Sequence, residues 1–193
     1  MHMEFFDALS EFNPGESAEL QLFMERQTEF FKSLSLKKNH FLVSEGEVCE
    51  NFCLIKNGIL QHSILVDGDE KTTYLGLKNS ITTSLASFLN RKPSRKSIKA
   101  ISDCDLLVIG KKDFSHLLET NREFNRLYYS LIERQICLID EYRIDLLTLS
   151  PEERYAKLLR TETELLHEVP LHYLASFLGI SGRHMSRIRK KTS

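Results

Sequence analysis

The sequence predicts an α+β protein with an N-terminal antiparallel β-roll, a long helix and a C-terminal helix-turn-helix. Three observations support this fold class. Short apolar or alternating segments recur between turn signals over residues 32–109, and an uninterrupted helical pattern covers about 121–148. Residues 169–191 then have the pattern of two short helices joined by a glycine. Strands that come first and helices that come later favour an α+β architecture over strand–helix alternation.

The composition is that of an ordinary globular chain. The 193 residues are 41% apolar and 27% charged, which is typical of soluble proteins. The apolar runs are shorter than the ~20 residues that a membrane span requires. The acidic start, MHMEFFDALSEF, does not resemble a secretory signal. We therefore expect a cytoplasmic protein with no membrane partner.

Closely spaced turns define the roll. Asn57-Gly58 and Asp67-Gly68 are strong hairpin signals, and each is flanked by short segments rich in apolar residues. Such segments, without long helical patterns between them, predict an antiparallel sandwich or barrel.

The helix over about 121–148 has two apolar stripes, and a helix that is apolar on two sides must bury both. One stripe can cover the roll, and the other needs a partner, for which a second copy of the same helix is the economical choice. The alternative is a helix buried between two domains of one monomer. The residues assigned to the dimer helix are Phe124, Tyr128, Leu131, Leu138 and Tyr142, and the second stripe holds Ile132, Ile136, Ile139 and Leu146.

A helix-start signal marks the expected domain boundary. In Ser150-Pro151-Glu152-Glu153, serine can cap, proline suits the first helical position, and Glu153 completes a capping box. The sequence therefore predicts a sensor domain over 1–149 and a DNA-binding domain over 150–193, with the first helix of the second domain running to about Leu166.

The last stretch of the chain has the pattern of a helix-turn-helix. Gly179 supplies a turn where a positive φ is cheap only without a Cβ. Ser181 is placed to cap the following helix, expected over 182–191.

That second helix is amphipathic in an unusual way. At 100° per residue, Arg183, Arg187 and Lys190 fall within a sector of roughly 60°, while Met185 and Ile188 lie on the opposite side. An anchored apolar back and a front of long donors is what a helix entering a DNA major groove needs. The alternative interpretation is a solvated basic amphipathic tail.

The order of these parts resembles that of the bacterial Crp/Fnr family of transcription regulators, named after the cyclic-AMP receptor protein and its anaerobic-regulator relatives. The segments that show the resemblance are Ser44-Glu45-Gly46-Glu47 and Leu54-Ile55-Lys56-Asn57-Gly58 in the roll, and 150–155, 174–181 and 186–190 in the C-terminal part. The resemblance implies a homodimeric regulator that senses an effector in its roll and docks paired helices on an inverted-repeat site. Double-stranded DNA, a second copy and RNA polymerase are the implied macromolecular partners.

The resemblance also implies roles for individual residues of the second helix. Arg183 and Arg187 match positions that contact base edges, and Ser181 and Ser186 match positions near phosphates. His184 lies at the flank of the same face. The remaining DNA-binding candidates are Arg189, Lys190 and Lys191.

The sequence departs from the family at the effector pocket and at its end. The family holds a cyclic nucleotide with a Gly-Glu pair and, about ten residues later, an arginine that clamps the phosphate. The matching region of this chain contains neither glycine nor acid, and we expect no cyclic AMP binding and no cofactor. The pocket candidates are Thr82, Thr83, Ser84 and Arg95. The sequence stops two residues after Lys191, so we expect no full β-hairpin wing.

Two other functions are compatible with a roll. A cupin-like metalloenzyme would need closely spaced histidines, but the chain shows no His-x-His pair, and only His62 lies in the middle of an expected strand. The four cysteines lack metal-ligand spacing, and reduced thiols are the expectation. We therefore expect neither a metal site nor an enzyme. A degenerate roll that serves as a ligand-free DNA-binding or protein-docking scaffold is the second alternative.

Overall fold

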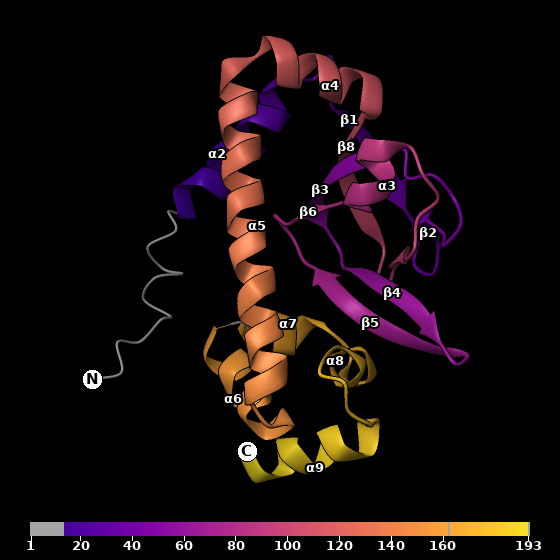
Figure 1. Cartoon of the computed structure of the whole chain (residues 1–193), viewed down its shortest axis with the longest axis vertical. Helices are drawn as coiled ribbons and strands as arrows, with labels where there is room; N and C mark the ends of the chain where they lie inside the picture. The colour runs from indigo at the N-terminus through magenta and orange to yellow at the C-terminus, as the bar shows by residue number, and fades with distance from the viewer. Residues whose placement is uncertain (1–13, 162, 193) are drawn as a thin grey trace.

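The computed structural model describes residues 14–161 and 163–192, which form a β-roll, one long helix and a small helical domain (Figure 1). The long helix α5 (Arg122–Thr148) runs from the roll down to the C-terminal helices. Helix α4 (Lys111–Thr120) lies at one end of α5, and α6 (Pro151–Thr161), α7 (Thr163–Glu168) and α9 (Gly182–Thr192) lie at the other.

Two four-stranded antiparallel sheets form the roll, as expected from the turn pattern. The first sheet has the order β1-β8-β3-β6 and the second has the order β2-β7-β4-β5. Every strand pair is antiparallel. The strands are β1 (Lys32–Leu36), β2 (Phe41–Val43), β3 (Asn51–Asn57), β4 (Leu60–Val66), β5 (Asp69–Gly76), β6 (Ile81–Thr82), β7 (Ser97–Ala100) and β8 (Cys104–Gly110).

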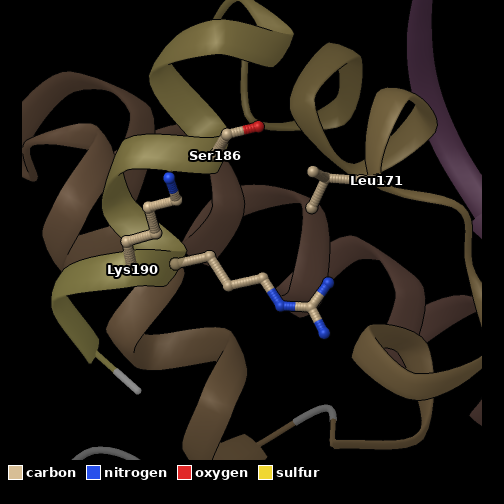
Figure 2. Close-up of a pocket in the computed structure, with 4 residues that line it drawn as sticks. Leu171, Ser186 and Lys190 are labelled. Carbon is tan, nitrogen blue, oxygen red and sulfur yellow. The ribbon is translucent and has the colours of Figure 1, made fainter.

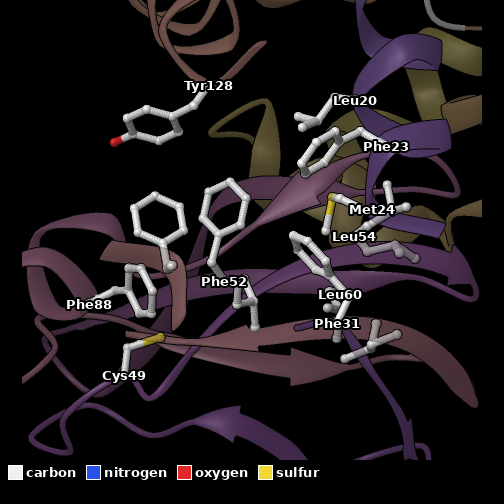
Figure 3. Packing of buried hydrophobic residues seen from close by; sticks show 14 of the residues in the cluster. Leu20, Phe23, Met24, Phe31, Cys49, Phe52, Leu54, Leu60, Phe88 and Tyr128 are labelled. Carbon is white, nitrogen blue, oxygen red and sulfur yellow. The ribbon is translucent and has the colours of Figure 1, made fainter. Parts of the chain in front are cut away.

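An aromatic cluster joins the roll to the helices that cover it. The Phe114 ring on α4 lies 5.1 Å, centroid to centroid, from the rings of both Phe52 on β3 and Phe88 on α3 (Leu85–Asn90). Phe124 and Tyr128 on α5 complete the cluster, and α2 (Pro14–Arg26) adds Phe23 beside Phe124. Figure 3 labels Phe23, Phe52, Phe88 and Tyr128 of this cluster, which lie close to the strands of the roll. The start of α5 is therefore part of the roll core.

The two faces of α5 have different surroundings. The residues assigned to the dimer helix face the chain itself: Phe124 and Tyr128 are buried in the roll core, Leu131 packs against that core, Leu138 is half-buried, and Tyr142 contacts Phe177. The second stripe differs, because Ile136 is 61% exposed and Ile139 is 65% exposed. Phe124 and Tyr128 cannot belong to an exposed dimer surface as assigned from the sequence, because the roll core buries them, and the exposed apolar stripe of α5 is the second one.

The capping box at the start of α6 forms as the sequence predicts. The Ser150 amide donates to Glu153 Oε2 at 2.7 Å, and the Glu153 amide donates to Ser150 Oγ at 3.3 Å. The Ser150 hydroxyl also donates to Glu153 Oε2 at 2.7 Å, and this bond, together with the one from the Ser150 amide, lowers the pKa of Glu153. The continuous helix expected up to Leu166 is instead divided into α6 and α7.

Within the described ranges, no helix has the length and apolar character that a membrane span requires.

A second hydrophobic cluster packs the helical domain against the outer face of the second sheet. From the roll it contains Ile59, Leu75, Leu77 and Ile101, and from the C-terminal helices it contains Tyr155, Val169, Leu174, Ala175, Leu178, Met185 and Ile188. Helix α8 (Leu171–Phe177) lies beside β5 in this cluster. The β4–β5 hairpin is thus the element of the roll that contacts the helix-turn-helix.

Candidate nucleic-acid interface

A glycine turn and a serine cap set the angle between α8 and α9. Gly179 adopts φ +71°, a conformation that strains residues with a side chain. Ser181 Oγ accepts a hydrogen bond from the His184 amide at 3.2 Å, which satisfies one free donor of the first turn of α9. These contacts form the helix-turn-helix that the sequence predicts.

Helix α9 is anchored by its apolar side and presents its cations to solvent. Met185 is fully buried and Ile188 is 3% exposed, both in the second hydrophobic cluster. Arg183, Arg187 and Lys190, on the opposite side, are exposed. The structure therefore places these three cations together on one accessible face.

The other DNA-binding candidates lie around this face in different roles. His184 Nε2 lies 2.9 Å from Glu152 Oε1 at the start of α6, so one candidate is paired with a carboxylate. Ser186 donates within its own helix to the Gly182 carbonyl at 2.9 Å. Ser181, which caps the start of α9, is exposed to solvent.

An open groove between α8 and α9 borders the same face. It is lined by Leu171, Ser186, Arg189 and Lys190 (Figure 2). Arg189 is exposed on the groove side and lies off the sector of the other arginines. The Lys191 backbone belongs to α9, but its side chain lies outside the described part of the chain.

Three contacts fix the helix-turn-helix to the end of α5. The Tyr142 hydroxyl donates to the Phe177 carbonyl at 2.9 Å, and the two rings stack at 5.3 Å. Arg154 donates to the carbonyls of Leu149 and Leu178 at 2.8 and 2.9 Å. Lys157 forms a largely buried ion pair with Asp145. These contacts join the end of α5 to α8 directly and to the turn after α8 through α6.

A polar contact ties α8 to the roll. The Thr72 amide on β5 donates to Ser176 Oγ at 2.9 Å, and Ser176 Oγ donates to the Glu70 carbonyl at 3.3 Å. Below it, Gln61 Nε2 donates to Thr72 Oγ1 at 2.8 Å, while Gln61 Oε1 is buried with no hydrogen-bond partner. Since an unsatisfied buried acceptor costs about 1–3 kcal/mol, this interface is only partly optimised.

Inside the roll, three of the pocket candidates are hydrogen-bonded to neighbours that sequence reasoning did not select. Thr82 Oγ1 lies 2.5 Å from His62 Nε2, and Ser84 Oγ lies 2.8 Å from Ser94 Oγ. Thr83 donates to the Asn51 carbonyl at 2.9 Å.

Arg95 lies apart from the other pocket candidates. It is exposed, whereas Lys96, the next residue, directs Nζ to His62 Nδ1 at 2.9 Å. The structure thus brings together Thr82 and Ser84 with His62, Ser94 and Lys96. The available signal was His62 in the middle of a strand, but only strand pairing shows that it meets Lys96.

Burial controls the charges of this interior group. The pKa of His62 is far below its usual value, mainly because burial penalises the imidazolium and also because Lys96 is adjacent. Burial also lowers the pKa of Lys96. The imidazole is therefore neutral at neutral pH, so it can accept a hydrogen bond from the lysine.

Cysteines and possible metal ligands are separated in the fold. Cys49, Cys53 and Cys104 are buried free thiols, and Cys137 is an exposed free thiol on α5. Burial raises the pKa of the Cys53 thiol well above its usual value, which keeps it protonated and unreactive. Among the described residues, no three or more His, Cys, Asp or Glu side chains gather as a metal site.

The chain combines a β-roll and its covering helices with a C-terminal helix-turn-helix. Residues 33–121 match the family model of the cyclic nucleotide-binding domain. Most of the chain shares its fold with transcription regulators of the Crp/Fnr type, which confirms the resemblance inferred from the sequence.

Solved structures similar to this chain come from several bacteria. FixK2 from Bradyrhizobium japonicum aligns with a TM-score of 0.68 and 16% identity over 83% of each chain. The c-di-GMP-responsive global regulator CLP of Xanthomonas campestris aligns with a TM-score of 0.65 and 15% identity over 91% of each chain. A protein from Eubacterium rectale assigned to the Crp/Fnr family aligns with a TM-score of 0.60 and 19% identity, over 98% of this chain and 86% of the other. No curated protein sequence matches the chain significantly.

Proposed function

We propose that the protein is a homodimeric transcription regulator that binds an inverted-repeat DNA site with α9. The observation that carries this proposal is the anchored cationic face, in which Arg183, Arg187 and Lys190 are exposed opposite the buried Met185 and Ile188. A free basic tail would not have a buried back and a capped start. We propose a regulator rather than a cupin-like enzyme, because His62 is bonded to Thr82 and Lys96 inside the roll.

The exposed stripe of α5 supports the dimer. Tyr129, Ile132, Ile136, Ile139, Arg143 and Leu146 follow one another at alternating spacings of three and four residues, and all but Arg143 are apolar. This heptad spacing is typical of the seam of a two-stranded coiled coil, in which each helix offers the same surface to the other. A second copy of this chain is therefore the occupant that we propose for the stripe.

The proposal is that an effector other than cyclic AMP controls DNA binding. Ser84 and Ser94 are hydrogen-bonded directly to each other, and neither can supply the negative or positive charge with which the family clasps a cyclic nucleotide. The competing scaffold hypothesis, in which the roll binds no ligand, shares the DNA-binding and dimer proposals. RNA polymerase is a proposed further partner for an activator.

Fluorescence anisotropy with DNA selected from a random pool tests the reading helix. Arg183→Ala or Arg187→Ala should each cost about 1–3 kcal/mol and relax discrimination between the selected site and random DNA. Lys190→Ala should weaken binding to all sequences and reduce the salt slope by about one. Arg122→Ala, an exposed arginine at the start of α5, is the matched control. Arginine variants that still discriminate as well as the unmodified protein would refute the assignment of base readers.

Sedimentation tests the dimer separately. Replacing both Ile136 and Ile139 by Asp buries two charges in the proposed seam, so the protein should sediment as a monomer and lose affinity for the full inverted repeat. Leu22→Asp places a charge at another exposed apolar position, on α2, and should leave the mass unchanged. An unmodified protein that sediments as a monomer at micromolar concentration would overturn the dimer proposal.

A further inference from the structure

The ammonium group of one lysine in the roll has more N–H donors than there are hydrogen-bond acceptors near it. Lys96, just before β7, points its ammonium at His62 on β4, with 2.9 Å between Nζ and Nδ1. Since an ammonium can only donate, Nδ1 accepts, and the imidazole proton lies on Nε2, which donates to Thr82 Oγ1 at 2.5 Å. His62 is only 3% exposed, so this chain of bonds is fixed within the roll.

The ammonium has no counter-ion in the described part of the chain. It has three N–H groups, and the bond to His62 uses one of them. Lys96 forms no ion pair with a carboxylate of residues 14–161 or 163–192. Three other long cations of the roll differ in this respect: Lys99 is paired with Glu70, Lys56 with Glu25 and Arg91 with Glu50.

The groups around Lys96 are neutral and rich in hydroxyls. Ser94 Oγ accepts from the Lys96 amide at 3.3 Å and lies 2.8 Å from Ser84 Oγ. The Ser94 hydroxyl uses its own proton on the Lys96 carbonyl at 2.6 Å. Thr82 and Ser84 are also buried, and their hydroxyls can rotate to donate. A buried or half-buried cation surrounded by neutral donors favours a negatively charged ligand, because the ligand supplies both the missing acceptors and the missing charge.

We propose that Lys96, His62 and the hydroxyls of Thr82 and Ser84 form a receptor for the anionic group of a small effector, a carboxylate or a phosphate. The free donors of Lys96 bind the anion, and His62 holds the lysine in position through Nδ1. The arrangement does not use the Glu and Arg of the family's cyclic-nucleotide clasp, which this chain lacks. The effector role of the site rests on the proposed regulatory function, whereas anion binding itself does not.

One hairpin connects this receptor to the DNA-reading domain. His62 and Ser63 on β4 pair with Tyr74 and Thr72 on β5, and the rings of His62 and Tyr74 lie 5.0 Å apart. The Thr72 amide then donates to Ser176 on α8. An anion that pulls Lys96 and His62 therefore acts on the same two strands that hold the helix-turn-helix.

Isothermal titration calorimetry of the full chain with inorganic phosphate and, separately, with acetate tests the receptor at constant ionic strength. We use the Arg183→Ala background, so that α9 contributes less to phosphate binding. At least one anion should bind saturably, and the arm that binds identifies the group. Lys96→Met should weaken that binding at least tenfold, Lys96→Arg should retain it within about threefold, and Lys92→Met, an exposed lysine of the same loop, should leave it unchanged.

A second measurement avoids dependence on variants that fail to fold. Reductive methylation of the unmodified protein, mapped by mass spectrometry, should show that the bound anion protects Lys96 and not Lys92. The proposal is overturned if neither anion binds saturably, if Lys96→Met binds as tightly as the parent, or if the anion does not protect Lys96. Anisotropy on the selected DNA separates the two proposals: normal DNA binding with no anion binding refutes only the receptor, and anion binding without DNA binding refutes only the regulator.

Discussion

The roll interior and helix α9 place their cations in opposite ways. On α9, Arg183, Arg187 and Lys190 extend into solvent from a helix whose apolar back is buried. In the roll, Lys96 turns inward and rests on a neutral histidine. The exposed cations suit a large, flexible polyanion such as DNA, whereas the inward lysine suits one small anionic group. The difference shows that the position of a cation relative to the core, more than the number of cations, separates the two candidate sites.

The roll core should dominate stability, and breaking it gives the largest expected effect. Phe114 is fully buried and contacts the rings of Phe52, Phe88, Phe124 and Tyr128. Phe114→Ala should lower the free energy of unfolding by about 3–5 kcal/mol, because it removes apolar burial and leaves a cavity. Urea denaturation followed by circular dichroism measures the loss. Leu22→Ala, at an exposed site, should change stability by less than about 0.5 kcal/mol, and equal losses in both variants would refute this assignment of the core.

Acid should weaken the interior site and spare the exposed one. The folded-state pKa of His62 is well below its value of about 6.5 in an unfolded chain. Its contribution to stability is therefore fully present above pH 6.5 and is lost as the pH falls below 6.5, where the unfolded chain takes up a proton that the folded chain does not. The slope from this one group approaches about 1.4 kcal/mol per pH unit.

Comparison of histidine variants isolates that slope. In urea denaturation at a series of pH values from 7.5 down to 5, His62→Gln should show a flatter decline in stability than the unmodified protein. His40→Gln, at an exposed position, should decline as the unmodified protein does. A His62→Gln variant that loses stability as steeply as the parent would show that this imidazole takes up a proton in the folded state.

The polar contact between α8 and β5 should contribute less to the free energy of unfolding than either hydrophobic cluster does. Ser176→Ala removes the hydroxyl that accepts from the Thr72 amide and donates to the Glu70 carbonyl, and it should cost about 1 kcal/mol. Amide hydrogen exchange should then show faster exchange at Thr72, while the aromatic core of the roll keeps its protection. Ser33→Ala, on the exposed side of β1, is the control, and unchanged exchange at Thr72 in the Ser176 variant would remove this contact from the coupling route.

The sequence predicted the features that are local in the chain. The capping box at Ser150 and Glu153, the left-handed Gly179 and the Ser181 cap all form between residues a few positions apart. The two faces of α9 follow from helical periodicity alone. The antiparallel β-roll was also predictable, because Asn-Gly and Asp-Gly pairs in the sequence mark its hairpin turns.

Features that depend on long-range pairing were not predictable. His62 and Lys96 are 34 positions apart and meet because β4 pairs with β7, where His62 lies opposite Ile98. The sequence showed two apolar stripes on α5 but not which one the roll would bury. The observed fold settles this through Phe124 and Tyr128, which join the aromatic core and leave Ile136 and Ile139 exposed.

Selection of bound sequences from a random DNA pool tests the central claim most directly. The full chain should enrich a short inverted repeat whose half-sites lie about one helical turn, roughly 10 base pairs, apart, because two copies of α9 are related by a two-fold axis. The Arg183→Ala variant should enrich a repeat with lower information at the same position of each half-site. Enrichment of no sequence, or of a single site without two-fold symmetry, would contradict the dimeric DNA-reading account.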